Sequence, residues 1–190
     1  MITDCTFNEL DELNFYQLFN YRYEVFVKTL GWNLDLNKYQ IINKIELDQF
    51  DNQDTVYIYR TNNSGEINGC ARLLPTNKPY LLEMVFPELM SGAILPKEPS
   101  VWELSRFTSL DLNSSRKRQF DPFKSSGFLI EVFSVARKHG AKYLLSVSPV
   151  GIEKLLVKNR FRFTIIGNNI IFNGYELTVL LFNLDEYSNI

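Results

Sequence analysis

Histidine and cysteine are the two reactive residue types that this 190-residue sequence almost lacks. A single histidine, His139, leaves serine–histidine triads, multi-histidine metal sites and C2H2 zinc fingers without support. Two cysteines, Cys5 and Cys70, cannot build a disulfide framework, and so small a number fits a reducing compartment. We therefore expect no metal site, and we expect any acid–base chemistry to fall mainly on carboxylates.

Long apolar runs and glycine-rich phosphate loops are missing as well. No stretch approaches the roughly 18 apolar residues that a membrane-spanning helix needs, and the N-terminus has neither a basic nor an apolar leader segment. Neither G-x-G-x-x-G nor G-x-x-x-x-G-K-[ST] occurs, so the nucleotide-binding folds built on these loops lose their key residues. We expect a soluble, cytoplasmic protein with no membrane span.

The composition that remains is that of a globular domain, with 45% hydrophobic and 22% charged residues. The length predicts one domain over residues 1–190 with a full core. Charge is unevenly distributed, because residues 1–60 carry 5 basic and 10 acidic side chains whereas residues 116–162 carry 11 and 3. The second segment is either a docking surface for an acidic partner or a set of solvated helix faces.

The apolar pattern changes along the chain between helical and strand-like spacing. Helical spacing covers residues 10–30, 123–139 and 150–159, and the glycines at 31 and 140 are expected to end the first two helices. Strand-like segments cover residues 55–60, 67–74, 101–110, 143–148, 163–166, 170–172 and 176–182. Helices placed among strands predict an α/β fold, a single-domain αβα sandwich around one mixed sheet.

Two clusters in the N-terminal third combine charge with aromatic rings. In a helix, Arg22 and Phe26 share a face, and a cation beside rings such as Phe26 and Trp32 can hold a carboxylate or a sulfonium. Alternatively, both aromatic residues belong to the core. Asp48 and Asp51 flank an aromatic residue at a spacing that can bind an ammonium, a hydroxyl or an arginine, or that forms a turn or a helix cap.

Two further clusters lie in apolar strands. Arg72 either has a buried partner, because unpaired burial of a charge is costly, or places its guanidinium in water at a sheet edge. Glu103 and Arg106 would point to opposite faces of a regular strand, so a shared site requires a bulge between them. A structural ion pair with another element is the other interpretation. Together the four clusters favour a pocket for a partly apolar zwitterion.

Four segments, in this order, carry a resemblance to a known family: R-Y-E-V-F-V-K-T-L-G-W (22–32), E-L-D-Q-F-D (46–51), G-C-A-R-L-L-P-T (69–76) and W-E-L-S-R-F (102–107). With S-P-V-G-I-E-K-L-L (148–156), the sequence resembles the LuxI-type acyl-homoserine-lactone synthases, or autoinducer synthases, over nearly the whole chain. The resemblance implies a twisted mixed sheet like that of GCN5-related N-acetyltransferases. It also implies acyl transfer from acyl carrier protein to the amine of S-adenosylmethionine, then lactone closure with release of methylthioadenosine.

The resemblance also assigns roles to the matched residues. It implies that Glu103 is the general base and that Arg106 acts in catalysis beside it. The implied S-adenosylmethionine site consists of Arg22, Phe26, Trp32, Asp48, Asp51, Arg72 and Phe86. The candidate acyl pocket, whose members are otherwise ordinary core residues, consists of Leu104, Leu144, Ser146, Ser148 and Ile152. S-adenosylmethionine is a co-substrate in this scheme, and no permanently bound cofactor is implied.

The basic third quarter gains a partner from the same resemblance, because acyl carrier proteins are acidic. Lys154 and Lys158 are four residues apart on one predicted helix and therefore share a face. The expected docking patch consists of these two residues with Arg116, Lys117, Arg118, Lys138, Lys142 and Arg160. Such a patch steers the encounter electrostatically and weakens with salt.

Three rival functions are weighed against this one. A GCN5-related acyltransferase using acyl-coenzyme A on another small amine has a glycine-containing pyrophosphate loop at a helix start, and here no glycine occurs between residues 114 and 126. A binder of nucleic acid or another anionic partner has the segment 116–118 but no recognised motif, and the chain is acidic overall. A degenerate synthase kept as a ligand sensor is disfavoured by intact Glu103 and Arg106.

Overall fold

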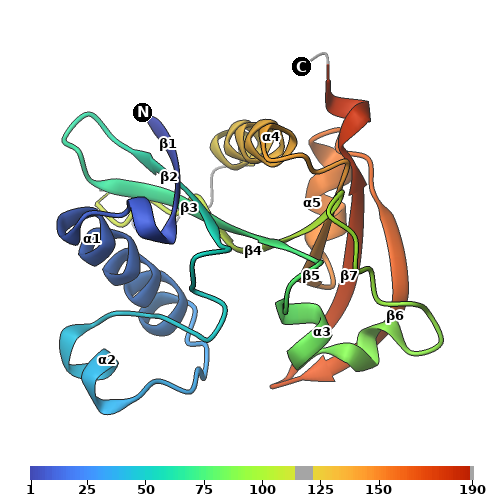
Figure 1. The fold of residues 1–190 in the computed structure, drawn as a ribbon, viewed down its shortest axis with the longest axis horizontal. Helices are drawn as coiled ribbons and strands as arrows, with labels where there is room; N and C mark the ends of the chain where they lie inside the picture. Colours follow the sequence, from blue (N-terminus) through green and yellow to red (C-terminus); the bar gives the residue numbers. More distant parts are fainter. Residues whose placement is uncertain (114–121, 189–190) are drawn as a thin grey trace. The chain divides into compact units, whose positions relative to one another are not determined.

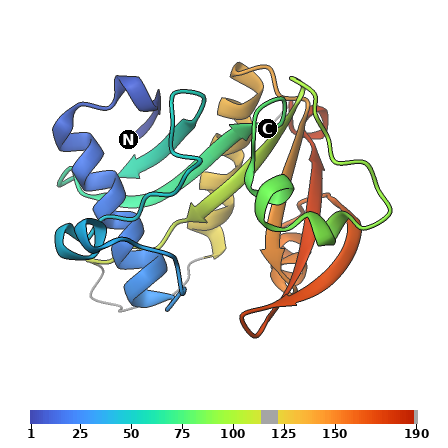
Figure 2. The same cartoon turned by 60° about the horizontal axis from the view of Figure 1, so that its bottom comes forward.

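The structure, a computed structural model, describes residues 1–113 and 122–188 of the chain (Figures 1 and 2). The chain divides into two compact units, of which unit 1 comprises Met1–Arg72 and Arg106–Asp121, and unit 2 comprises Leu73–Ser105 and Pro122–Ile190. Within the described residues, seven strands follow the order β1-β2-β3-β4-β5-β7-β6 in one sheet. The predicted mixed sheet with helices is therefore confirmed, while one domain over 1–190 stays a prediction.

Unit 1 contains the N-terminal helices and the first strands. Its elements are β1 (Ile2–Thr6), η1 (Phe7–Glu9), α1 (Glu12–Arg22), the π-helical η2 (Tyr23–Thr29), α2 (Lys38–Asn43), β2 (Val56–Thr61) and the first six residues of β3 (Ile67–Pro75). The predicted first helix is confirmed, and it ends before Gly31, whose φ of 67° favours glycine. Strand β1, which pairs antiparallel with β2, and helix α2 were not predicted from the apolar pattern.

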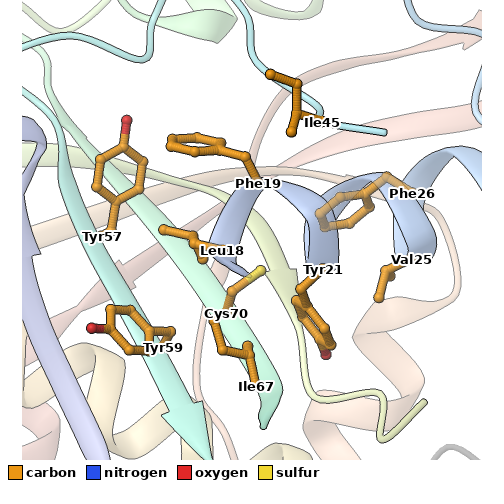
Figure 3. Close-up of a cluster of buried hydrophobic side chains, with 10 residues drawn as sticks. All are labelled: Leu18, Phe19, Tyr21, Val25, Phe26, Ile45, Tyr57, Tyr59, Ile67 and Cys70. Atoms are coloured by element: carbon orange, nitrogen blue, oxygen red, sulfur yellow. The ribbon is translucent and has the colours of Figure 1, made fainter. Parts of the chain in front are cut away.

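Helix α1 is held at its start by a cap and along its length by the core. Asp11 accepts a hydrogen bond from the backbone N–H of Asn14 at 2.7 Å, which satisfies one of the free amides of the first turn. The core of unit 1 joins α1 and η2 to β2 and β3 (Figure 3), and it consists of Leu18, Phe19, Tyr21, Val25, Phe26, Ile45, Tyr57, Tyr59, Ile67 and Cys70. Leu13, part of the predicted apolar face, is instead exposed.

Unit 2 contains the remaining strands and helices. Its elements are the rest of β3, α3 (Leu81–Val85), η3 (Pro87–Met90), the first five residues of β4 (Val101–Thr108), α4 (Pro122–Lys138), β5 (Tyr143–Pro149), α5 (Ile152–Lys158), β6 (Thr164–Phe172), β7 (Tyr175–Asn183) and η4 (Leu184–Tyr187). Strand β5 pairs parallel with β4 and antiparallel with β7. Among the described residues, no helix has both the length and the apolar character needed to cross a bilayer.

Aromatic packing fixes the helices of unit 2 on the sheet. The Phe133 ring of α4 lies 5.1 Å from the Phe182 ring of β7 and 4.8 Å from the Tyr187 ring. On α5, Leu156 is buried as predicted, whereas Ile152 is 38% exposed although the sequence places it on the inner face. The predicted strands at 163–166 and 170–172 form one strand, β6, whose register shifts between Ile166 and Ile170.

The bulge in β6 brings Gly167 against η3, which lies beside β6 in Figure 2. Gly167 has φ of 71°, and a Cβ there would lie 2.0 Å from the carbonyl oxygen of Leu89. We expect Gly167→Ala to lower the free energy of unfolding by about 3 kcal/mol, because it adds overlap with a backbone atom to an unfavourable φ. Urea unfolding measures this loss.

Gly174→Ala is the matched control for this prediction. Gly174 has φ of 81° but nothing within 4 Å of the position of its Cβ. We expect a loss of only about 1 kcal/mol, due to φ alone. Equal losses at the two positions would show that the contact with Leu89 has no part in the effect.

Candidate functional site

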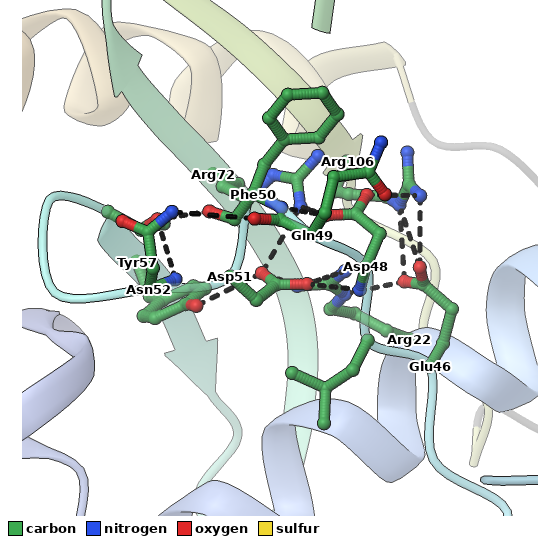
Figure 4. A network of polar contacts seen from close by, with 12 residues as sticks. Arg22, Glu46, Asp48, Gln49, Phe50, Asp51, Asn52, Tyr57, Arg72 and Arg106 are labelled. Atoms are coloured by element: carbon green, nitrogen blue, oxygen red, sulfur yellow. Dashed lines mark hydrogen bonds and ion pairs between the residues drawn. The ribbon is translucent and has the colours of Figure 1, made fainter. Parts of the chain in front are cut away.

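Six charged side chains from distant parts of the sequence meet in unit 1 (Figure 4). We call this group the charged cluster, and it consists of Arg22, Glu46, Asp48, Asp51, Arg72 and Arg106. Three guanidinium groups face three carboxylates, so the cluster is formally neutral. The sequence predicted five of these residues as site residues, and the structure brings all five together.

Arg22, the last residue of α1, is 1% exposed and is bound on both sides. Its Nε donates to Glu46 Oε2 at 2.6 Å. Its Nη1 and Nη2 donate to the two carboxylate oxygens of Asp51 at 2.8 and 3.0 Å, a bidentate arrangement that fixes the guanidinium plane. Helix α1 thereby places one cation between the two acidic ends of the 46–51 segment.

Asp48 is shared by the other two arginines. Arg72 Nη1 donates to Asp48 Oδ1 at 2.5 Å, and Arg106 Nη2 donates to Asp48 Oδ2 at 3.0 Å. The alternative in which Arg72 reaches water at a sheet edge is wrong, because Arg72 is fully buried and also lies 3.2 Å from Asp51. The Asp48 side chain is 17% exposed, more than the other members of the cluster.

The segment 48–51 is a turn as well as a charged site. Asp48 Oδ1 accepts from the backbone N–H of Phe50 at 2.9 Å, and Asp51 Oδ2 accepts from the backbone N–H of Asp48 at 2.8 Å. Both interpretations of this motif are therefore correct. The turn bonds fix the carboxylates in position before any ligand arrives, so the cluster is preorganised.

Arg106 departs from regular strand geometry. Its φ is 52°, in the left-handed region that few non-glycine residues adopt, and its carbonyl oxygen accepts from Cys70 Sγ at 3.4 Å. The regular strand geometry of β4 is thus interrupted at Arg106, whereas a site shared by Glu103 and Arg106 stays a prediction. Burial raises the pKa of Cys70 to about 12, so this thiol stays protonated and able to donate.

Two aromatic rings adjoin the guanidinium of Arg106. Phe26 and Trp32 are stacked with centroids 4.7 Å apart, and Arg106 Cζ lies 5.8 and 5.6 Å from the two centroids. Phe26 is buried in the core, whereas Trp32 is half-buried. Phe26 is therefore a core residue on which Trp32 stacks, and the half-buried Trp32 ring lies beside the charged cluster, where it suits a cationic ligand.

The cluster keeps two of its carboxylates, those of Glu46 and Asp51, ionised. Burial alone raises the pKa of Glu46, but the positive charges of Arg22 and Arg106 outweigh it and lower the pKa to about 2. Burial likewise opposes ionisation of Asp51, and the charges of Arg22 and Arg72 hold the pKa of Asp51 well below its usual range. At neutral pH Glu46 and Asp51 are therefore fixed negative charges that hold no proton to transfer.

Glu103 lies in unit 2 and is fully buried. Its Oε2 accepts from the backbone N–H of Leu81 and its Oε1 from that of Leu82, both at 2.8 Å. Tyr80, the residue before α3, makes no side-chain hydrogen bond to the first turn of this helix. Glu103, which lies on β4, caps the helix in its place. These two bonds fix the orientation of the Glu103 carboxyl group.

The remaining candidates in unit 2 differ in exposure. Phe86 follows α3 and packs edge-on against Phe172 at 5.0 Å. The candidate acyl-pocket residues Leu104 and Leu144 are buried, and Ser146 and Ser148 are half-buried with their hydroxyl oxygens 3.2 Å apart. Their contact with an acyl chain stays a prediction.

The candidate docking patch is only partly described. Lys154 and Lys158 are both exposed on α5, as their spacing predicted. The other exposed cations of the patch are Lys138, Lys142 and Arg160. Three further members lie outside the described residues, namely Arg116, Lys117 and Arg118.

Two residues of the cluster region were not assigned to the site from the sequence. Glu46 bridges Arg22 and Arg106, and Tyr57 donates from its hydroxyl to Asp51 Oδ1 at 3.0 Å. Glu46 stands within the E-L-D-Q-F-D segment, so its proximity to Asp48 was a usable signal. Nothing in the sequence around Tyr57 marks it. In the part of the chain that the structure describes, no group of three or more histidine, cysteine, aspartate or glutamate residues is suited to hold a metal ion.

Comparison with known proteins identifies the class. Residues 6–189 match the family described as autoinducer synthase. An acyl-homoserine-lactone synthase of Acinetobacter nosocomialis is 40% identical over 168 residues, which cover 87% of this chain and 89% of that protein. The chain is therefore an acyltransferase. More particularly, it belongs to the autoinducer synthase family.

Solved structures agree with this assignment. TofI, in a ternary complex with an inhibitor and MTA, superimposes with a TM-score of 0.81 at 31% identity, covering 97% of this chain and 91% of that one. MesI, described as a CoA-dependent acyl-homoserine lactone synthase, gives 0.80 at 25% identity, covering 97% and 89%. An acyl-CoA N-acyltransferase from Pseudomonas aeruginosa gives 0.64 at 11% identity, covering 96% and 98%. This last likeness concerns the fold alone and agrees with the predicted GCN5-related type.

Proposed function

We propose that this protein makes an acyl-homoserine lactone by transferring an acyl chain from acyl carrier protein to the amine of S-adenosylmethionine. The nitrogen attacks the thioester carbonyl, its proton passes to a base, and the thiol of the donor leaves. The carboxylate then attacks the carbon that bears sulfur, which closes the lactone and releases methylthioadenosine. The observation that carries the proposal is the charged cluster beside two stacked rings, in a chain of the autoinducer synthase family.

The charged cluster suits one end of this substrate. Asp48 is its most exposed acid, so it faces the ammonium or sulfonium charge, and the half-buried Trp32 ring, stacked on Phe26, faces the same cation. The ion pairs among Arg22, Asp51, Arg72 and Asp48 hold the Asp48 carboxylate in place. Because Arg106 already donates to Glu46 and Asp48, we expect it to hold the substrate carboxylate only loosely, which leaves that carboxylate nucleophilic.

The lactone-forming step needs little acid–base help. A carboxylate and a sulfonium combine into a neutral ester and a neutral thioether, so the two reacting charges disappear together. Both groups belong to one molecule. Binding that molecule in a folded conformer orients the two groups and so lowers the activation free energy. The charged cluster, whose ion pairs hold it in place, acts on this step by positioning.

Unit 2 supplies the base and the acyl slot in this scheme. An α-amino group has a reference pKa of about 8, so a carboxylate such as Glu103 suffices to take its proton, directly or through water. We assign Phe86 to the S-adenosylmethionine side, and the acyl slot to Leu104, Leu144, Ser146, Ser148 and Ile152. The acyl chain is apolar, and the buried leucines offer it an apolar wall.

Mass spectrometry of extracts from cells that express this chain tests the proposal. We expect acyl-homoserine lactones that a vector control lacks. With purified protein, S-adenosylmethionine and one acyl chain presented on carrier protein or on coenzyme A, we expect a higher kcat/KM for the carrier. A preference for coenzyme A would favour the rival donor, which the name of MesI states for that relative. Acylation of another amine without lactone would contradict the proposal.

Docking of an acidic acyl carrier protein on the exposed lysines of α5 gives a further prediction. Lys154→Glu with Lys158→Glu should raise the KM for acyl carrier protein about tenfold at low salt and leave the KM for S-adenosylmethionine unchanged, because an acidic partner meets reversed charges. The effect should shrink as salt rises. The control, Lys38→Glu with Lys78→Glu, changes the net charge equally at exposed positions elsewhere. Equal effects of both pairs would place the docking surface elsewhere.

A further inference from the structure

Strand β7 carries a buried hydroxyl that lacks a hydrogen bond. Thr178 is 1% exposed, and its Oγ1 has no hydrogen-bond partner among the described residues. An unbonded buried hydroxyl is unfavourable, and valine, which has the same shape, would avoid the penalty. A polar atom kept in such a place points to a partner that the chain itself does not supply.

The sheet register places this hydroxyl beside two others. Thr178 pairs with Ser148, and Ser146 pairs with Leu180 two residues further along β7. Paired residues of antiparallel strands share a face, as do residues two apart in one strand. Thr178, Ser148 and Ser146 therefore lie on one face of the β5–β7 pair. The Ser146 and Ser148 hydroxyls contact each other at 3.2 Å, which accounts for those two but not for Thr178.

The surroundings of this hydroxyl group are apolar and lie where two strands part. Leu180 and Phe182, on the same face as Thr178, are buried. Among the described residues, the register between β4 and β5 ends at Glu103 and Leu145, one residue before Ser146. Beyond that point β5 keeps its pairing with β7 to Leu177. From Ser146 onward the β4 side of β5 thus has no strand partner among the described residues, and Ser146 and Ser148 are only half-buried there.

We propose that Thr178 determines acyl-chain specificity by hydrogen bonding to an oxygen atom, oxo or hydroxy, carried by the acyl chain. The inference rests on the proposed function, because it places the acyl chain along Leu144, Ser146 and Ser148. The acyl chain of the donor lies beside β5, and its oxygen substituent is the hydrogen-bond partner that Thr178 lacks. A threonine hydroxyl both donates and accepts, so it binds an oxo group as an acceptor and a hydroxy group as either.

The test compares three acyl donors of one chain length: unsubstituted, 3-oxo and 3-hydroxy. We expect the wild type to favour at least one oxygenated donor over the unsubstituted donor about tenfold in kcat/KM, the scale of one well-placed hydrogen bond. Thr178→Val should remove most of this preference by lowering kcat/KM for the oxygenated donor alone. Whether the oxo or the hydroxy donor loses more identifies the substituent.

Two variants keep the test sharp. Thr178→Ser retains the hydroxyl and should retain the preference, and Thr164→Val removes an exposed hydroxyl from β6 and should change nothing. The melting temperature of Thr178→Val should equal or exceed that of the wild type, so misfolding does not obscure the result. If the wild type makes lactone but Thr178→Val keeps the wild-type preference, the inference is overturned. If no donor gives lactone, the proposed function itself fails, and the inference with it.

Discussion

Replacing Glu103 by glutamine should lower kcat for lactone formation by about a hundredfold or more. A positioned carboxylate that takes a proton in the transition state contributes roughly 10²–10⁴ to the rate, and the amide of glutamine cannot accept that proton. Single-turnover measurements of amide formation from S-adenosylmethionine and an acyl donor would isolate this step. We expect the KM for S-adenosylmethionine to change little, because the loss concerns the transition state.

A structural role for Glu103 makes a second variant necessary. Its two oxygens accept from the backbone amides of Leu81 and Leu82, so the NH2 of a glutamine would face an N–H and loosen α3. Leu81→Pro removes one of the same bonds from the other side while it keeps the carboxylate. Proline is tolerated at the first residue of a helix, and the extended backbone of Tyr80 is compatible with a following proline.

Together, Glu103→Gln and Leu81→Pro distinguish the role of Glu103 as a base from its role as the cap of α3. If Glu103 is the base, Leu81→Pro should retain most of the activity while Glu103→Gln loses it. The pH dependence of kcat/KM should lose its acid limb in Glu103→Gln alone, because that limb reports an essential base. Equal losses in both variants would show that Glu103 acts only by holding α3, and the base would then have to be sought elsewhere.

The sequence predicted the residues of the charged cluster better than it predicted their arrangement. Arg72 was recognisable because a charge in an apolar strand needs a partner. Arg22 was recognisable because it shares a helix face with Phe26, and Asp48 because it flanks an aromatic residue together with Asp51. The role of Glu46 was not, because it depends on Arg106, sixty residues further along, adopting a positive φ. The hydrophobic period and the helix and strand propensities describe residues close together in the sequence. They carry no information on a contact between residues sixty positions apart.

The same limit explains what was missed in unit 2. Helix α3 has five residues, too short to show a helical period, so the capping of its amides by Glu103 could not be anticipated. Strand β6 was divided in two because Gly167 and its neighbours interrupt the apolar alternation. The long helix α4, with its full amphipathic period and the glycine at its end, was predicted to within one residue at each end.

Replacing Glu46 by glutamine should cost about 3–5 kcal/mol of unfolding free energy at pH 7, because it leaves buried Arg22 and Arg106 without their shared carboxylate. In a chain of this length such a loss lowers the melting temperature by roughly 10 °C. The exposed Glu131→Gln, which removes the same charge from α4, should change the stability by less than about 0.5 kcal/mol. Thermal and urea unfolding measure both.

The pH dependence identifies the cause. An unfolded glutamate titrates near pH 4.3, roughly the reference value, whereas the pKa of Glu46 in the folded protein is about 2. Its ionisation therefore stabilises the protein fully above about pH 4.3, and this contribution is lost as the pH falls towards 2. At pH 3 the stability gap between wild type and Glu46→Gln should be smaller than at pH 7 by about 1–2 kcal/mol. A gap of constant size would mean that Glu46 stabilises the cluster by its shape and not by its charge.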